Sequence, residues 1–154
     1  MIEITKYLQT VYEDLQRYVD NDVCLCKFKE LNFEAGALPD YEDINIQQLY
    51  LLRYAFAYAF EYSRMYLDVL SQMDGVNGIS VTSVGCGSMI DYWSLVHALE
   101  MKRKIDCSIR YVGIDKIDWS YKIPKRQNDE VHYLIGNAAD VFAHNSQFIS
   151  NVYF

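Results

Sequence analysis

The sequence predicts an α/β fold in which parallel β-strands follow a helical region. Three short apolar runs, at 79–84, 108–114 and 131–135, are each followed directly by a glycine or an acidic residue. A helical pattern at 89–101 separates the first two runs. The order strand, helix, strand favours parallel strands that are joined by helical crossovers.

The helical region is expected to span 1–74 and the α/β region 75–154. An apolar stripe at steps of three or four predicts a first helix over 2–19, formed by Ile4, Leu8, Val11, Leu15 and Tyr18. Residues 23–45 contain glycine, proline and several acids, and are expected to form an irregular connection. A long helix is predicted over 46–73, because this stretch lacks both glycine and proline.

The long helix carries a tyrosine row, which consists of Tyr50, Tyr54, Tyr58, Tyr62 and Tyr66. Four residues turn a helix by about 400°, so the row drifts slowly around one side. We expect this row to be an aromatic face that packs on a neighbouring sheet. The alternative is that one of the tyrosines, or Arg53, reaches a ligand.

The α/β region begins with a buried strand at 79–84 and a glycine turn, Gly85-Cys86-Gly87-Ser88. After the helix at 89–101 and the strand at 108–114, residues 119–130 are expected to form a loop or a short helix. The strand at 131–135 is followed by a short helix at 138–142 and by the start of a fourth strand at 148–154.

The glycine turn is the first candidate site. A sharp strand-to-helix turn needs residues that tolerate unusual backbone angles, and glycine also lets a ligand approach the backbone. Asp115 ends the next strand, 28 residues after Gly87. A carboxylate at that position can accept both hydroxyls of a ribose. Ligands in such sheets bind outside the carboxyl ends of the strands.

Three motifs in this order resemble those of class I S-adenosylmethionine (SAM) dependent methyltransferases. Val84 to Gly87 resembles the family's motif I, and Tyr111 to Asp115 resembles motif II, whose acid holds the ribose. Leu134 to Ala138 resembles the third motif, in which an Asp or Asn meets the adenine amino group; here that residue is Asn137.

This resemblance covers about residues 79–154. It implies a Rossmann-like three-layer α/β/α sandwich, here incomplete and with an N-terminal helical extension, that binds SAM. The cofactor-binding residues that it implies are Gly85, Cys86, Gly87, Ser88, Asp115, Lys116, Asn137 and Ala138. The tyrosine-rich helix resembles the leading helix that many such enzymes place ahead of strand one. The resemblance assigns no catalytic residue and no methyl acceptor.

The sequence departs from the family pattern at two places. Met89 stands where many members carry a third glycine. The family fold usually has seven strands, whereas this sequence ends at 151–154, within the fourth. We therefore expect a fragment, or a domain that a partner chain completes, and we expect residues 1–154 alone not to methylate an acceptor.

Two other functions are compatible with the sequence. A dinucleotide-binding protein would show G-x-G-x-x-G, but Ile90 occupies the third glycine position and would obstruct close helix–strand packing. A non-catalytic interaction module on the same fold would use the aromatic helix and the acidic first half as a partner surface.

Charge and composition argue against several classes of protein, namely nucleic-acid-binding, membrane-spanning and secreted proteins. The net charge is −7, and the acidic excess lies wholly within residues 1–74, so a general nucleic-acid footprint is not expected. No apolar run approaches the roughly 18 residues that span a bilayer, and the N-terminus does not resemble a secretory signal. We expect a cytoplasmic protein.

Cysteines and histidines give no metal or catalytic motif. The cysteines are Cys24, Cys26, Cys86 and Cys107, and we expect four free thiols and no metal site, since no pair shows the usual zinc spacing. The histidines, His97, His132 and His144, are expected to have structural or surface roles.

Overall fold

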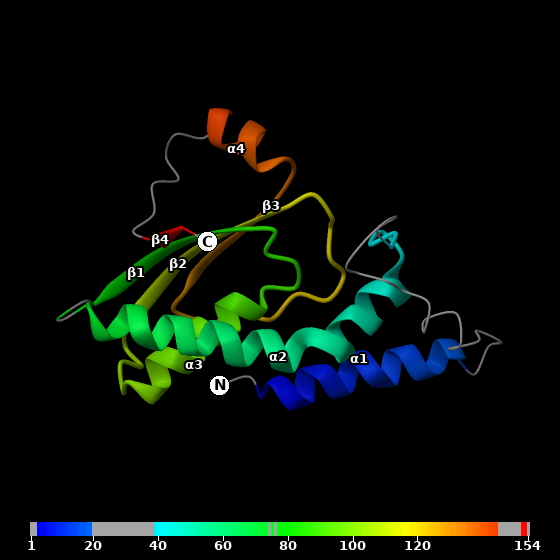
Figure 1. The fold of residues 1–154 in the computed structure, drawn as a ribbon, viewed down its shortest axis with the longest axis horizontal. Coiled ribbons are helices and arrows are strands. Elements are labelled where there is room, and N and C mark those ends of the chain that lie inside the picture. Colours follow the sequence, from blue (N-terminus) through cyan, green and yellow to red (C-terminus); the bar gives the residue numbers. More distant parts are fainter. Residues whose placement is uncertain (1–2, 20–38, 74, 76, 145–151, 154) are drawn as a thin grey trace.

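The computed structural model describes residues 3–19, 39–73, 75, 77–144 and 152–153, and it is a mixed α/β structure (Figure 1). The elements in chain order are α1 (Ile4–Val19), α2 (Ile44–Ser71), β1 (Gly78–Val84), α3 (Ile90–Met101), β2 (Ser108–Asp115), β3 (Glu130–Ile135), α4 (Ala138–His144) and β4 (Val152–Tyr153). The expected connection at 23–45, the cysteines Cys24 and Cys26, and most of the fourth strand lie wholly or largely outside the described residues.

The strands form one parallel sheet in the order β3-β2-β1-β4. The chain therefore moves outward from β1 through β2 to β3, and then returns to place β4 on the other side of β1. Parallel pairing of the first three strands, with α3 between β1 and β2, confirms the sequence prediction. The predicted bounds of these strands agree with the structure to within one residue.

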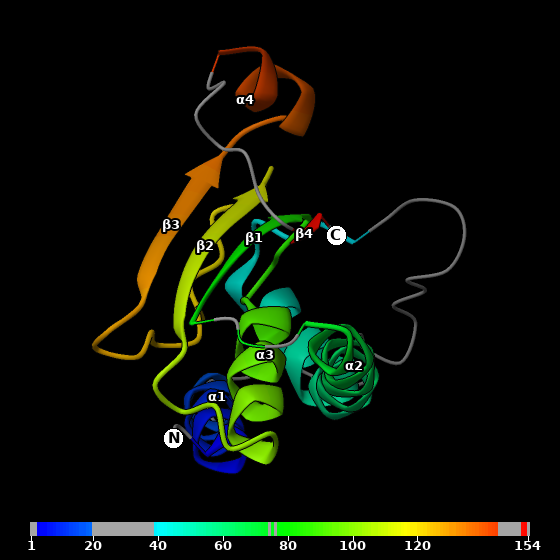
Figure 2. The same cartoon turned by 90° about the vertical axis from the view of Figure 1, so that its left-hand side faces the viewer.

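Helices α1, α2 and α3 lie together on one face of the sheet, whereas α4 lies beyond the carboxyl end of β3, away from them (Figures 1 and 2). Alternate strand residues explain this arrangement. Ile79 and Val81 of β1 and Ile109 and Tyr111 of β2 belong to the same buried cluster as Leu95 of α3. Side chains two apart point to one face of a strand, so this face of the sheet is the one that packs on α3.

Helix α2 makes its main contact with α3. It begins at Ile44, because Asp43 accepts a hydrogen bond from the Asn45 backbone N–H at 2.8 Å and caps the helix. Ala55 and Ala59 are buried and let α3 approach closely. The tyrosine row was expected to pack on a sheet, but the helix that carries it packs mainly on another helix, α3, so this expectation is wrong. Within the row, Tyr66 is the residue that is buried.

Asp129 lies beside the start of β2 and hydrogen-bonds to β2, to α3 and to the loop before β3. Its buried carboxylate accepts hydrogen bonds from the Ile109 backbone N–H at 3.0 Å and from the Tyr92 hydroxyl at 2.6 Å. Arg126 adds a two-pronged ion pair, with both contacts at 2.8 Å. Burial by itself would raise the pKa of Asp129, but the hydrogen bonds from Arg126 and Tyr92 lower it below its usual value.

No helix in the described part of the chain is long and apolar enough to cross a membrane.

Candidate functional site

The turn between β1 and α3 has an unusual backbone. Gly85 and Gly87 have φ angles of 71° and 51°, and Met89 has a φ of 69°. This left-handed region is readily open to glycine and is uncommon for other residues. Met89, which stands where the motif that this turn resembles often has a third glycine, thus has a glycine-like backbone, and its side chain is buried. Helix α3 starts directly after it, at Ile90.

Asp115 holds this turn in place. The parallel register sets Val84 beside Ile114, so the ends of β1 and β2 lie next to each other. One carboxylate oxygen of Asp115 accepts the Gly87 backbone N–H at 2.7 Å, and the other accepts the Ile117 N–H at 2.9 Å. A carboxylate offers about four acceptor positions, so these two bonds leave capacity for further donors.

Cys86 packs between the turn and β2. A Cβ atom on Gly113 would lie 2.7 Å from the Cys86 sulfur, so this strand position requires glycine. Burial raises the pKa of the Cys86 thiol well above its usual range, and nearby Asp91 and Asp115 add to the shift. A thiol of this kind is unreactive at neutral pH. Its role is packing against Gly113.

A cavity of about 450 Å³ lies over the turn. Its walls come from the segment before α2, from α2 itself, from the turn and the start of α3, and from the loop after β2. The lining residues are Tyr41, Tyr50, Tyr58, Tyr62, Ser83, Val84, Gly85, Cys86, Gly87, Ser88, Ile90, Asp91, Asp115, Ile117 and Trp119.

Aromatic rings form one wall of the cavity. The Trp119 ring lies 5.5 Å from that of Tyr50 and 5.9 Å from that of Tyr41, measured between centroids. Tyr58 and Tyr62 continue the wall along α2, with their rings 6.1 Å apart. Part of the tyrosine row, Tyr50, Tyr58 and Tyr62, therefore lines the cavity, whereas Arg53 does not. The alternative expectation, that one of these tyrosines or Arg53 reaches a ligand, stays a prediction.

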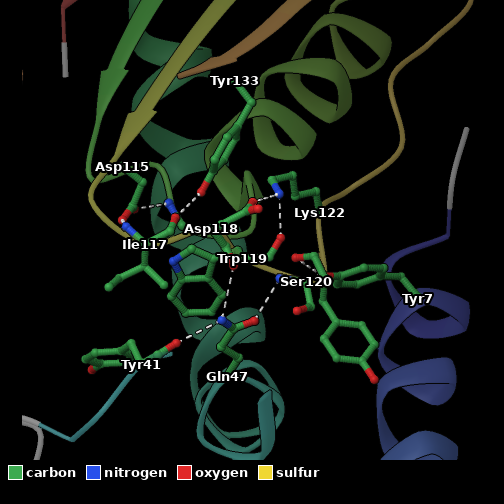
Figure 3. Close-up of polar contacts among 12 residues, drawn as sticks. Tyr7, Tyr41, Gln47, Asp115, Ile117, Asp118, Trp119, Ser120, Lys122 and Tyr133 are labelled. Carbon is green, nitrogen blue, oxygen red and sulfur yellow. Dashed lines mark hydrogen bonds and ion pairs between the residues drawn. The ribbon is translucent and has the colours of Figure 1, made fainter. Parts of the chain in front are cut away.

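Gln47 fixes this wall. Its buried side-chain amide donates to the Tyr41 carbonyl at 2.8 Å and lies 3.5 Å from the Asp118 carbonyl (Figure 3). Its oxygen accepts the Ser120 backbone N–H at 2.9 Å. One side chain on α2 thus joins the segment that carries Tyr41 to the loop that carries Trp119.

Asp91 lies in the first turn of α3 and is buried, with 5% of its surface exposed. The Tyr111 hydroxyl lies 2.9 Å from each of its carboxylate oxygens. Burial raises the pKa of Asp91 above its usual value, whereas hydrogen bonds from Ser83 and Tyr111 oppose this shift. A buried carboxylate in a cavity wall is a typical feature of functional sites.

The residues implied by the resemblance divide into two groups. Five of them line the cavity: Gly85, Cys86, Gly87, Ser88 and Asp115. Lys116, Asn137 and Ala138 are not among its lining residues. Asn137 is exposed, and its side-chain oxygen accepts the Ala139 backbone N–H at 3.0 Å at the start of α4.

Sequence reasoning did not identify Tyr41, Asp91 or Trp119 as site residues. Asp91 could have been noticed, because it is an acid within an otherwise hydrophobic helix start, Met89 to Trp93. Trp119 lies four residues after Asp115 in a polar stretch, where a large aromatic residue is unusual. Tyr41 gave no signal in the sequence.

The charged side chains that line the cavity are all acidic. Its lining residues include two carboxylates, Asp91 and Asp115, and neither lysine nor arginine. Within the described residues, no group of three or more His, Cys, Asp or Glu side chains is placed to hold a metal ion.

No protein-family model matches this chain, and neither a curated protein nor a solved structure shows significant similarity to it.

Proposed function

We propose that the cavity binds SAM and that the chain is the cofactor-binding part of a methyltransferase on a Rossmann-like fold. One observation carries this proposal: the Asp115 carboxylate contacts the Gly87 N–H at the point where two parallel strands end. The arrangement supports the proposal because a carboxylate able to accept ribose hydroxyls would lie beside a glycine backbone that a ligand can approach closely.

The strand order supports the same fold. The order β3-β2-β1-β4 matches the first part of the doubly wound order 3-2-1-4-5-6. In such sheets a ligand binds outside the carboxyl ends of the strands, at the point where the order reverses. That point is β1, and the glycine turn directly follows it.

The charge of the cavity favours SAM over a dinucleotide. A pyrophosphate carries negative charge, and here it would face Asp91 and Asp115 with no lysine or arginine among the lining residues. The Gly87 N–H, which could otherwise donate to a phosphate, donates to Asp115. SAM has no phosphate, and its sulfonium is positive, so the same carboxylates attract it.

The residues of the chain would act by binding and positioning. Asp115 would accept the ribose hydroxyls, the glycine turn would allow close approach, and the aromatic wall would exclude water from the site. When bound, SAM supplies a methyl group on a sulfonium, which is an electrophile. Holding such a group in one orientation toward an acceptor is the main way in which a protein speeds methyl transfer.

Calorimetry with S-adenosylhomocysteine (SAH), the demethylated product, tests this proposal. Replacing Asp115 by Ala should weaken binding by about 1.5–3 kcal/mol, because hydrogen bonds to a charged group are lost. The matched control is Asp118→Ala, which removes an exposed acid of the same loop that pairs with Lys122. Equal SAH affinity in the parent and Asp115→Ala would exclude the ribose role.

A non-catalytic interaction module is the second candidate. Phe56 and Phe60, one turn apart on α2, are 57% and 71% exposed, and exposed aromatic pairs are typical of partner surfaces. Light scattering on the parent and on a Phe56→Ser, Phe60→Ser double variant tests self-association. Under this candidate the parent associates and the variant does not; a parent that stays monomeric at high concentration counts against self-association through this patch.

A further inference from the structure

Asp91 is a buried carboxylate that forms no ion pair with a lysine, arginine or histidine among the described residues. Its oxygens accept from the Tyr111 hydroxyl, and it lines the cavity. A buried charge is costly unless it is paired. Asp91 therefore has the chemistry of one half of an ion pair.

The surroundings of Asp91 keep the carboxylate in place. Tyr111 bridges both of its oxygens, Ser83 hydrogen-bonds to it, and it lies at the N-terminus of α3, where the helix dipole favours negative charge. These contacts orient the group and stabilise an anion, but they do not neutralise it. A cation that enters the cavity can do so.

Two tyrosines that line the same cavity as Asp91 suit the same kind of ligand. Tyr58 and Tyr62 line the cavity from α2 with their rings 6.1 Å apart. Burial raises the pKa of the Tyr62 hydroxyl, and the negative charge of Asp91 raises it further, so the two groups are electrostatic neighbours. Tyrosine faces attract ammonium and sulfonium groups through their ring electrons.

We propose that Asp91, together with Tyr58 and Tyr62, forms a subsite within the cavity for an organic ammonium group. Asp115 lines the same cavity and would take uncharged hydroxyls. The assignment of Asp115 to a ribose rests on the proposed function, whereas the cation subsite rests on the Asp91 geometry. The cation can belong to the cofactor's amino-acid end or to a separate amine.

The first experiment compares two ligands on the parent protein by calorimetry. SAH carries an ammonium group, whereas 5′-methylthioadenosine has the same adenosine and thioether but lacks the amino-acid end. If the cofactor supplies the cation, SAH should bind roughly 10- to 100-fold more tightly, the value of a hydrogen bond to a charged group. Asp91→Asn should remove this preference and leave the affinity for 5′-methylthioadenosine unchanged. Asp115→Asn should weaken both ligands.

The second experiment tests a separate amine. Benzylamine and its uncharged analogue benzyl alcohol are titrated into the parent and into Asp91→Asn, both saturated with 5′-methylthioadenosine and then without it. Binding of benzylamine that is stronger than that of the alcohol, and that is lost in Asp91→Asn, supports the subsite with an amine as the source of the charge.

The outcomes separate this inference from the proposed function. If neither adenosine ligand binds the parent but benzylamine binds through Asp91, SAM binding is excluded and the cation subsite stands. If SAH shows no advantage over 5′-methylthioadenosine and benzylamine none over the alcohol, the subsite is overturned. Both comparisons use the unmodified chain, so they can overturn the subsite even if Asp91→Asn does not fold.

Discussion

Two tyrosine–aspartate pairs lie in contact within the core, and they differ in one respect. Tyr92 donates to Asp129 at 2.6 Å, and Tyr111 donates to Asp91 at 2.9 Å. The two tyrosine rings meet edge to face with 5.4 Å between their centroids. Arg126 neutralises Asp129, whereas Asp91 faces a cavity without a cation from the described residues.

This difference separates a structural end of the sheet from a binding end. Asp129 has a charge partner and three kinds of hydrogen-bond donor, so it serves the fold. Asp91 has hydrogen-bond donors but no ion-pair partner in the described part of the chain, and it lines the cavity. Proteins accept such local costs mainly at functional sites. The predictions below test whether this division holds.

The largest effect is expected at the structural end. Asp129→Ala should lower the free energy of unfolding by about 3–5 kcal/mol, because it breaks a buried pair and leaves Arg126 without its partner. Urea denaturation at pH 7 measures this loss. Asp118→Ala is the matched control: its pair with Lys122 is largely exposed and should contribute less than about 1 kcal/mol. Similar losses in both variants would contradict the division.

The pH dependence of the free energy of unfolding provides a further test of the Asp129–Arg126 pair. The pKa of Asp129 is lower in the folded protein than in the unfolded chain. The unfolded state therefore binds the proton more readily, and stability falls as the pH drops below about 4, the ordinary pKa of an aspartate. The stability difference between the parent and Asp129→Ala should shrink over this acidic range. Urea midpoints at a series of pH values measure it; a difference that stays constant into strong acid would count against the ion pair.

The next effect concerns the aromatic wall at the binding end. Gln47→Leu should cost about 1–3 kcal/mol, because the Ser120 N–H and the Tyr41 carbonyl lose their buried partner. It should also loosen Trp119, which acrylamide quenching reports in a Trp93→Phe background that leaves one tryptophan.

Gln48→Leu provides the matched control for this wall. Gln48 is as buried as Gln47, but it donates to the Tyr121 hydroxyl, which is not among the lining residues of the cavity. We expect a loss of stability with little change in Trp119 quenching. If both variants expose Trp119 equally, Gln47 is not a specific positioning residue for the wall.

The sequence was sufficient for the sheet because local signals coincide there. Apolar runs end at Gly85 and Asp115, and this pattern predicts the strands and puts the turn and the acid at the carboxyl ends of neighbouring strands. The hydrogen bond between Gly87 and Asp115 was not predicted. Trp119 and Tyr41 could not be placed, since their positions depend on the buried Gln47 amide, which joins the segment before α2 to the distant loop after β2.

For Asn137, the predicted contact and the contact in the structure differ. The motif pattern predicts a ligand contact for this residue, whereas the structure shows its side chain bonded to the Ala139 N–H at the start of α4. An asparagine just before a helix is also a common helix cap, and one sequence signal is compatible with both roles. Its proposed contact with adenine stays a prediction.

The smallest effect on the free protein is expected for Asp91→Asn. Burial raises the pKa of Asp91, so the folded protein holds this proton more tightly than the unfolded chain does. Stability therefore decreases as the pH rises from about 4, the unfolded pKa, through the folded pKa. Asparagine has no such charge to bury, so the variant should be at least as stable as the parent at pH 7, and this advantage should disappear in acid below the unfolded pKa. Thermal melts of both proteins across this range provide the measurement. If SAH supplies the cation, saturating SAH should reverse the order, since a ligand that binds only the folded state gives more stability to the protein that it binds more tightly. A loss of several kcal/mol in the ligand-free variant at pH 7 would instead make Asp91 a structural residue like Asp129.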